Sequence, residues 1–314
     1  IEPSFFELTV AMAFDYFARM EVEVAVIEVG MGGRLDSTNI ITPVLSVITN
    51  IGHDHMEFLG NTLAAVAGEK AGIIKEGVPV VIGESQTETT ETFVARAEMM
   101  KAPLTFADRE FRCNLGDPEK VNALRPYMLY DLLTRDRRGG ITPLGGLVQQ
   151  KNIQTAAAAF RKLEELFDLQ QDHFMKGVAN VIINTGLQGR WQVLAHSPLT
   201  VCDTAHNLEG LEYVVRQIRH TAKSGLHMVL GFVNDKDLSS ILPLFPKEAS
   251  YYFTRASIPR ALDENLLKAE AGKYGLEGES YSSVTKALEA ARLVAGDDDM
   301  IFIGGSTFVV AEVV

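Results

Sequence analysis

Residues 22–39 read VEVAVIEVGMGGRLDSTN, and this stretch indicates the fold most directly. Its first eight residues form a nearly continuous apolar, β-branched run, which is typical of a strand buried on both faces of a parallel sheet. Glu28 comes at the end of that run, and the glycines after it allow the backbone to approach a ligand closely. Because a buried carboxylate needs a partner, Glu28 is predicted to bind a metal or to pair with Arg34.

Helix and strand patterns alternate on both sides of this stretch. Ser4 and Glu7 have the capping-box spacing at the start of a helix predicted over residues 4–19. Further strands are predicted at 44–49 and 78–82, and further helices at about 62–75, 152–167 and 173–183. The less regular residues 107–150 are expected to hold a hairpin or a mobile loop. The alternation predicts an α/β fold with right-handed crossovers.

A second series of strands and helices begins after Arg190. Its predicted strands are residues 199–202, 227–231, 250–254 and 300–303, and its predicted helices are 208–220, 238–244, 262–274 and 283–294. Four strands separated by helices make a self-contained doubly wound domain. We therefore divide the chain into a domain of residues 1–190 and a domain of residues 191–314.

The composition excludes several classes of protein. The chain has 314 residues, of which 46% are hydrophobic and 22% charged, as in globular proteins and unlike disordered ones. A net charge of −12 argues against a nucleic-acid or anionic-membrane partner, because phosphate binding needs clustered Lys and Arg. Two cysteines, no zinc spacing and no apolar run of about 18 residues favour the reducing cytoplasm and no membrane span.

Polar side chains follow several predicted strands, and open parallel sheets bind their ligands at those strand ends. His53, Asp54 and His55 come soon after the strand at 44–49. Two imidazoles and a carboxylate indicate a divalent-cation site shared with Glu28, although Mg²⁺ normally takes few nitrogen ligands. The alternative is that one of the histidines caps the following helix.

Lys70 lies inside the helix predicted at about 62–75. A lysine there is either a solvated surface charge or a group lying against the sheet. If it is buried beside a cation, its pKa falls, and the neutral amine can take up CO₂ as a carbamate.

In the second domain, Asp203 follows the strand at 199–202, and His206 and Asn207 precede the next helix. This place suits a nucleotide phosphate or ribose, and simple helix capping is the alternative. Gly304, Gly305 and Ser306 end the last strand in the same manner, and no G-x-x-x-x-G-K-[ST] loop occurs. These residues alone indicate a two-domain α/β enzyme with a divalent cation and an anionic ligand between its domains.

Seven segments, in this order, resemble the folylpolyglutamate synthase/dihydrofolate synthase family, a branch of the Mur ligase superfamily. They are Pro3–Glu7, Glu28–Asn39, Asp54-His55, Glu69–Ile73, Gly189–Trp191, Asp203–Asn207 and Gly305-Ser306. They span nearly the whole chain, and the Asp-x-Ala-His-Asn segment separates this branch from the cell-wall Mur ligases. The resemblance implies a Mur ligase central domain built like P-loop NTPases, followed by a Rossmann-like C-terminal domain.

The resemblance also implies an activity and its residues. Members of the family use ATP and Mg²⁺ to join L-glutamate to a folate or to dihydropteroate through an acyl phosphate. The implied roles are Mg²⁺ ligation by Glu28 and His55, metal positioning by carbamylated Lys70, nucleotide contacts by Asn152, Arg190 and Asp203, a pterin-substrate site at Leu35, Asp36 and Ser37, and an essential interdomain role for His206. Around Asn152, the residues Gln149, Gln150 and Lys151 depart somewhat from the family pattern.

The family's phosphate loop and a further metal-ligand serine lie upstream of the segment that resembles Pro3–Glu7. We therefore expect the chain to be a fragment that does not turn over ATP by itself. The alternatives are a non-catalytic protein that binds nucleotide or folate, and another Mur-type amino-acid ligase. The family further implies a cytoplasmic monomer, and the sequence leaves open which of the two glutamate additions the protein performs.

Overall fold

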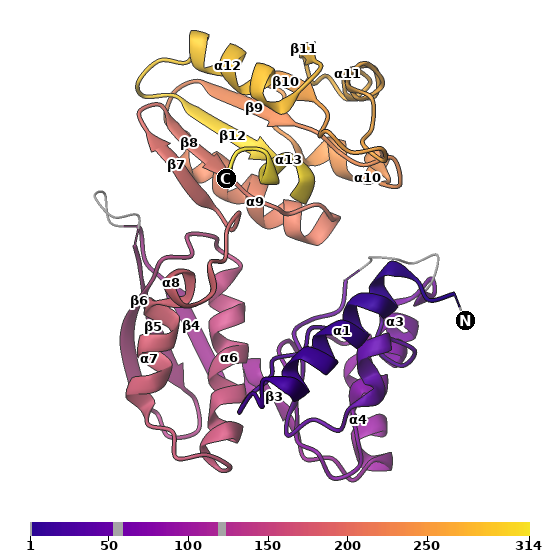
Figure 1. Cartoon of the computed structure of the whole chain (residues 1–314). Coiled ribbons are helices and arrows are strands. Elements are labelled where there is room, and N and C mark those ends of the chain that lie inside the picture. Colours follow the sequence, from indigo (N-terminus) through magenta and orange to yellow (C-terminus); the bar gives the residue numbers. More distant parts are fainter. Residues whose placement is uncertain (1, 53–58, 119–123) are drawn as a thin grey trace. The chain divides into compact units, whose positions relative to one another are not determined.

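The computed structural model describes residues 2–52, 59–118 and 124–314. The chain divides into two compact units, whose elements are labelled in Figure 1. Unit 1 comprises Ile1–Arg112, Asp131–Asp136 and Lys151–Gln170, and unit 2 comprises Cys113–Tyr130, Arg137–Gln150 and Gln171–Val314. The division of the ligase domains at Arg190 stays a prediction.

Unit 1 opens with helix α1 (Phe5–Arg19), which begins at the predicted capping box. The Ser4 hydroxyl accepts a hydrogen bond from the Glu7 N–H at 3.2 Å, and the Glu7 carboxylate accepts one from the Ser4 N–H at 2.7 Å. Two N–H groups that the helix itself leaves unpaired are thus satisfied, so the predicted helix start is confirmed.

The sheet of unit 1 has three parallel strands in the order β1-β2-β3. They are β1 (Ser46–Ile48), β2 (Val80–Ile82) and β3 (Leu104–Phe106), and the other elements are η1 (Ser37–Ile40), α3 (Leu63–Lys70), η2 (Ala71–Ile73), α4 (Thr90–Met99) and α5 (Ala107–Glu110). Apolar side chains of α3 and α4 pack against β1 and β2 to form one core. The predicted strands at 44–49 and 78–82 and the predicted helix at about 62–75 are confirmed.

The predicted strand at residues 22–29 is wrong. None of these residues takes part in a ladder of the described sheets, and Val24 and Val26 are 70% and 93% exposed. A β-branched run forms a strand only when a neighbour pairs its N–H and C=O groups. Here β1 pairs with β2, and the run lies outside the described sheets.

A small antiparallel sheet is formed by β4 (Phe111–Leu115), β5 (Arg125–Asp131) and β6 (Arg137–Thr142), so the predicted hairpin within residues 107–150 is confirmed. Helix α6 (Gln149–Glu164) follows, starting three residues before its predicted start. Next come α7 (Gln171–Ala179), which packs on β6, and α8 (Val181–Thr185).

The remaining chain of unit 2 forms a six-stranded sheet in the order β11-β10-β9-β12-β8-β7. Its strands are β7 (Gln192–His196), β8 (Leu199–Cys202), β9 (Leu226–Leu230), β10 (Ser250–Thr254), β11 (Gly278–Tyr281) and β12 (Met300–Gly304). All pair in parallel except β7, which is antiparallel to β8. The predicted parallel strands are confirmed, and β7 and β11 extend the sheet at its two edges.

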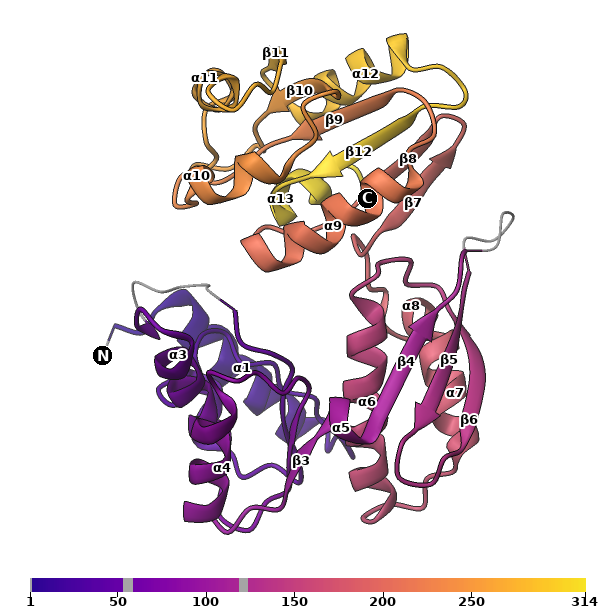
Figure 2. The ribbon, with the colours of Figure 1, turned by 180° about the vertical axis from the view of Figure 1, so that it is seen from behind.

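Helices cover both faces of this sheet, as Figure 2 shows. Side chains of α9 (Leu208–Thr221), α10 (Leu238–Ile241), η3 (Leu242–Leu244) and α11 (Glu264–Gly272) form the core on one face. Those of α12 (Val284–Val294) and α13 (Thr307–Ala311) form the core on the other. The predicted doubly wound architecture is confirmed. In the part of the chain that the structure describes, no helix is long and apolar enough to cross a bilayer.

Candidate functional site

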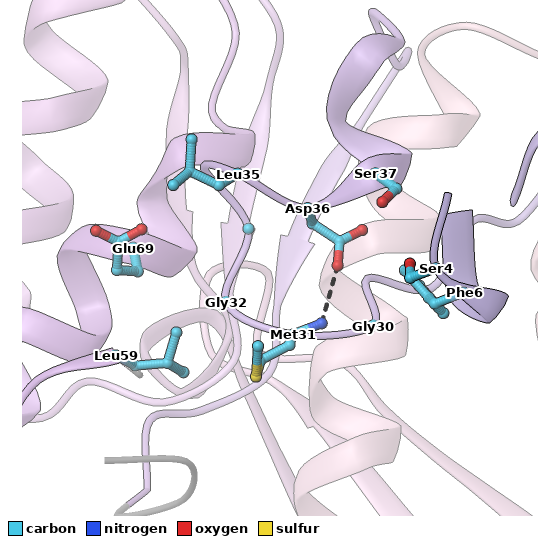
Figure 3. Close-up of a pocket in the computed structure, with 11 residues that line it drawn as sticks. Ser4, Phe6, Gly30, Met31, Gly32, Leu35, Asp36, Ser37, Leu59 and Glu69 are labelled. Atoms are coloured by element: carbon cyan, nitrogen blue, oxygen red, sulfur yellow. Dashed lines mark hydrogen bonds between the residues drawn. The ribbon is translucent and has the colours of Figure 1, made fainter. Parts of the chain in front are cut away.

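The glycine-rich loop after residue 29 lines a cavity of about 520 Å³ in unit 1. Figure 3 shows the lining residues, which come from three parts of the unit. They are Ser4 and Phe6 from the start of α1, Gly30–Gly33 and Leu35–Ser37 from the loop, and Leu59 and Glu69 from the region of α3. The structure therefore brings together three residues predicted for substrate binding, Leu35, Asp36 and Ser37, at one cavity.

Asp36 fixes the shape of the loop by hydrogen bonds at both carboxylate oxygens. Its Oδ2 accepts the Met31 N–H at 2.9 Å, drawn as the dashed line in Figure 3, and its Oδ1 accepts the Thr38 N–H at 2.9 Å. Burial opposes ionisation of Asp36, but the hydrogen bonds from Thr38 and Met31 outweigh it and lower its pKa. Asp36 is thus a charged loop anchor that also caps η1.

The loop lies directly against the end of α3. The Arg34 N–H donates to the Glu69 carbonyl at 2.8 Å, and the Arg34 guanidinium pairs with the Glu69 carboxylate at 3.0 Å. A methyl group at Gly33 would lie 3.0 Å from the carbonyl oxygens of Glu69 and Lys70. A side chain at position 33 would force the end of α3 to shift by a few tenths of an ångström, so this close approach favours glycine.

Lys70 ends α3 and is half-buried. Its backbone touches the glycine loop through Gly33, so the helix holds Lys70 beside the cavity-lining loop. This position lies between the two predicted alternatives, since Lys70 is neither fully solvated nor fully buried. Its carbamylation stays a prediction.

The predicted metal site is not assembled by the residues that the structure describes. Glu28 is exposed, because the strand that was expected to bury it does not form, and Arg34 pairs with Glu69 rather than with Glu28. His53, Asp54 and His55 lie outside the described residues. Within residues 2–52, 59–118 and 124–314, no three His, Cys, Asp or Glu side chains form a metal-binding group.

Gln86 holds the backbone at Ile51, just before the predicted metal ligands, and the sequence did not indicate this role. Its carboxamide oxygen accepts the Ile51 N–H at 2.9 Å, and its amide nitrogen donates to the Ile51 carbonyl at 2.8 Å. This arrangement imitates a rung of a β ladder and fixes the chain just before His53. A glutamine four residues beyond a strand carries no recognisable pattern, so no signal in the sequence indicated it.

In unit 2, Asp203 lies at the carboxyl end of β8, with both carboxylate oxygens accepting backbone N–H groups. Oδ2 accepts from Trp191 at 2.7 Å and Oδ1 from Ala205 at 2.8 Å. Asp203 is only 8% exposed. Burial raises its pKa, and the hydrogen bonds from Ala205 and Trp191 and the charge of Arg190 oppose that rise.

The other residues predicted near Asp203 lie in the same segment of unit 2. The exposed Arg190 donates a hydrogen bond to the Thr204 hydroxyl, and His206 Nδ1 lies 3.1 Å from the Thr204 carbonyl oxygen. Asn207 is the helix cap, since its Oδ1 accepts the Gly210 N–H at 3.0 Å. Capping of α9 thus falls to Asn207 and not to Asp203.

The ends of two neighbouring strands meet at Asp203. Its N–H donates to the Ile303 carbonyl of β12 at 3.1 Å, and Gly304 lies so close that a methyl group there would be 2.9 Å from the Asp203 carbonyl oxygen. The predicted strand ends at 203–207 and 304–306 are therefore adjacent. Asn152 lies in the first turns of α6 and is exposed.

Comparison with known proteins identifies two family models on this chain. Residues 5–109 match the Mur ligase middle domain, and residues 189–307 match the glutamate ligase domain of Mur ligases. The dihydrofolate synthase/folylpolyglutamate synthase of Bacillus subtilis is 31% identical over 320 residues, which cover 99% of this chain and 72% of that protein. The folylpolyglutamate synthase of Lacticaseibacillus casei is 33% identical over 319 residues, covering 98% and 70%.

Solved structures that resemble this chain come from the same group of enzymes. The structure of Escherichia coli FolC in complex with DHPP and ADP superposes with a TM-score of 0.82 at 28% identity, covering 99% of this chain and 70% of that one. A folylpolyglutamate synthase/dihydrofolate synthase from Yersinia pestis, complexed with AMPPNP and a Mn ion, superposes with a TM-score of 0.82 at 26% identity, covering 100% and 71%.

Proposed function

The chain belongs to the folylpolyglutamate synthase/dihydrofolate synthase family of Mur ligases, and on this premise we propose that the full-length protein joins L-glutamate to a folate or to dihydropteroate with ATP. Its α/β architecture is that of the Mur ligase middle and glutamate ligase domains. The protein is proposed to act as a cytoplasmic monomer on small molecules.

The cavity beside the glycine-rich loop is the observation that carries this proposal. Its lining combines apolar side chains, including Phe6 and Leu35, with the polar groups of Ser37 and Glu69. A cavity of about 520 Å³ lies within the usual range for small-molecule sites. It suits a flat pterin ring with hydrogen-bonding edges, and the FolC structure that contains DHPP supports this choice of ligand.

The proposed reaction forms an amide from a carboxylate and an amine. The substrate carboxylate attacks the γ-phosphorus of ATP, and ADP leaves, which gives an acyl phosphate. The glutamate amine then attacks the acyl carbon, loses a proton and expels inorganic phosphate. Charge on the transferring phosphoryl group has to be neutralised by positioned cations, and removal of one such contact typically lowers the rate by about 10²–10³.

Arg190 and Asp203 are the proposed nucleotide contacts in unit 2. Asn152, in unit 1, is the third proposed nucleotide contact. Asp203 is held at a strand end by two backbone N–H groups, and Arg190 is exposed beside it. Relatives solved with ADP or AMPPNP support a nucleotide as the ligand. His206 is proposed to be required where the domains meet.

A divalent cation, Mg²⁺ in our proposal, would be held by Glu28 and His55 and would neutralise phosphate charge. A carbamate on Lys70 would change that side chain from positive to negative, which suits a group that orients a cation. The relative solved with Mn supports a divalent cation in general.

Formation of ADP by the full-length gene product tests this function. We expect ADP only when ATP, a divalent cation, glutamate and a pterin substrate are all present. ADP formation that needs a cell-wall precursor instead would identify another Mur-type ligase. Nucleotide and folate binding without ADP formation would identify a non-catalytic protein.

A further inference from the structure

Gln217 of α9 clamps a turn that lies far from it in the sequence. Its Nε2 donates to the Gly145 carbonyl at 2.9 Å, and its Oε1 accepts the Leu147 N–H at 2.7 Å. Gln217 is only 4% exposed. A buried carboxamide that uses both of its ends on one turn holds that turn in position and orientation.

The turn held by Gln217 packs closely against Trp191 at Gly145. A methyl group at Gly145 would lie 2.8 Å from Trp191 Cδ1 and 3.2 Å from the Trp191 carbonyl oxygen. The Gly145 carbonyl also accepts a hydrogen bond from Arg125, which is itself buried and donates to the Gly116 carbonyl at 2.8 Å. The turn is therefore held by Arg125 at the Gly145 carbonyl and by Gln217 at both Gly145 and Leu147, directly beside the indole.

Trp191 connects the turn to Asp203. Its backbone has a left-handed φ of 48°, which bulky residues rarely adopt, and its N–H donates to Asp203 Oδ2 at 2.7 Å. The preceding residue is Arg190, which is bonded to Thr204. A continuous series of contacts thus runs from Gln217 through Gly145 and Trp191 to the strand end that carries Asp203.

We infer that Gln217 is a positioning residue for nucleotide binding, acting through the turn at Gly145 and through Trp191 on Asp203 and Arg190. This inference rests on the proposed function, because it assumes that these two residues contact a nucleotide. Without the clamp, the turn moves off the indole, Trp191 relaxes from its left-handed backbone, and the Asp203 carboxylate loses a fixed donor. The folate cavity of unit 1 contains none of these residues, so folate binding is unaffected.

The test uses the full-length protein with ADP as the probe. Gln217→Leu removes both hydrogen bonds, and Glu212→Leu is the matched control on the exposed face of the same helix. Trp191 is the only tryptophan of the 314 residues, and subtraction of the Trp191→Phe spectrum isolates its emission. We expect Gln217→Leu to shift that emission to the red and to raise the ADP dissociation constant at least about tenfold, the equivalent of about 1.4 kcal/mol.

Far-UV circular dichroism and the dissociation constant for a reduced folate should stay unchanged in Gln217→Leu. If this variant does not fold, Gln217→Glu replaces it, because it keeps the acceptor for Leu147 and loses only the donor to Gly145. An unshifted emission, or wild-type ADP affinity together with a shifted emission, would overturn the inference. A wild-type protein that does not bind ADP would refute the proposed function, whereas the emission of the variant would still report on the clamp.

Discussion

The backbone N–H of Trp191 and the carboxylate of Asp203 are joined by a buried hydrogen bond of 2.7 Å. Because the second oxygen of Asp203 is used by Ala205, the carboxylate is held in a single orientation at the end of β8. Burial raises the pKa of Asp203, and buried carboxylates with a shifted pKa are concentrated at functional sites. Nucleotide binding is the function that we assign to it.

Asp203→Ala is therefore expected to weaken ATP binding by at least about tenfold, equivalent to about 1.4 kcal/mol, and to leave folate binding nearly unchanged. Calorimetric titration with each ligand measures both effects. Glu212→Ala, on the exposed face of α9, is the control. Equal losses for the two ligands would count against the assignment of Asp203 to the nucleotide.

Lys70→Ala is expected to abolish ligase activity with the fold intact, because alanine cannot form a carbamate. Lys70→Arg keeps the positive charge and is expected to be inactive as well, which separates the carbamate from a simple charge effect. Carbon-13 NMR of wild-type protein in labelled bicarbonate should show a carbamate signal that is missing in both variants. Wild-type turnover by Lys70→Ala would refute this role.

Asp36→Ala removes the anchor of the glycine-rich loop, since the N–H groups of Met31 and Thr38 lose their acceptor. Hydrogen bonds to a charged group are worth about 1.5–3 kcal/mol, so KM for the pterin substrate should rise at least about tenfold. Asp36→Asn keeps one acceptor oxygen, so its KM should lie between those of Asp36→Ala and the wild type. Steady-state kinetics with unchanged KM in Asp36→Ala would place the substrate elsewhere.

Two glycines in and after α3 provide a matched pair for stability. A methyl group at Gly72 would lie 2.3 Å from Arg34 Cα, whereas a methyl group at Gly68 meets no atom within 4 Å. Gly72→Ala should therefore lower the free energy of unfolding by about 1–3 kcal/mol, since the backbone at Arg34 has to move. Gly68→Ala should raise it by about 0.5–1 kcal/mol, because alanine is the better helix former. Urea unfolding of both variants checks this, and the opposite order would mean that the loop is not packed against the end of α3.

Asp299 makes the free energy of unfolding depend on pH in the acidic range. Its carboxylate accepts the N–H groups of Gly296 at 2.8 Å and Gly225 at 2.7 Å and lies 3.3 Å from His227 Nε2. The hydrogen bonds from Gly296, His227 and Gly225 lower its pKa to about 2. Because the folded pKa lies below the unfolded value of about 3.9, the stabilisation is present above about pH 4 and is lost as the pH falls to about 2.

Unfolding in urea between pH 2 and 5 measures this effect. The difference in free energy of unfolding between wild type and Asp299→Asn should shrink as the pH falls through this window. The exposed neighbour Asp298→Asn is the control and should show the wild-type dependence. An equal pH dependence of wild type and Asp299→Asn would mean that these hydrogen bonds do not favour the charged carboxylate.

Local signals predicted much of this fold. The Ser4–Glu7 capping box and the short buried strands β8 and β10 were predicted at their observed positions, because each is determined by residues next to one another. The edge strands β7 and β11 were missed. Their polar residues, such as Gln192 and Glu279, lack the apolar run of a central strand, and a bulge between Val193 and Ala195 breaks the alternation in β7.

Residues 22–29 show the opposite error, because a strand was predicted there and none forms. Its β-branched residues suit a strand, but a strand also requires a partner, which no local pattern supplies. Side-chain clamps such as Gln86 and Gln217 escaped prediction for a related reason, because each joins segments 35 to 72 residues apart in the sequence. The positions of Leu35, Asp36 and Ser37 at one cavity were predictable because a single loop carries them.

Transfer of radiolabelled L-glutamate to a pterin substrate is the direct test of the proposed ligase activity. The full-length protein is incubated with ATP and Mg²⁺, and dihydropteroate is compared with a reduced folate. Lys70→Ala, which we expect to be inactive, is assayed in parallel. We predict that label enters at least one of the two substrates only when ATP is present, and that this substrate names the specificity. No labelled product with either substrate, from a protein that binds both ATP and the pterin, would contradict the account.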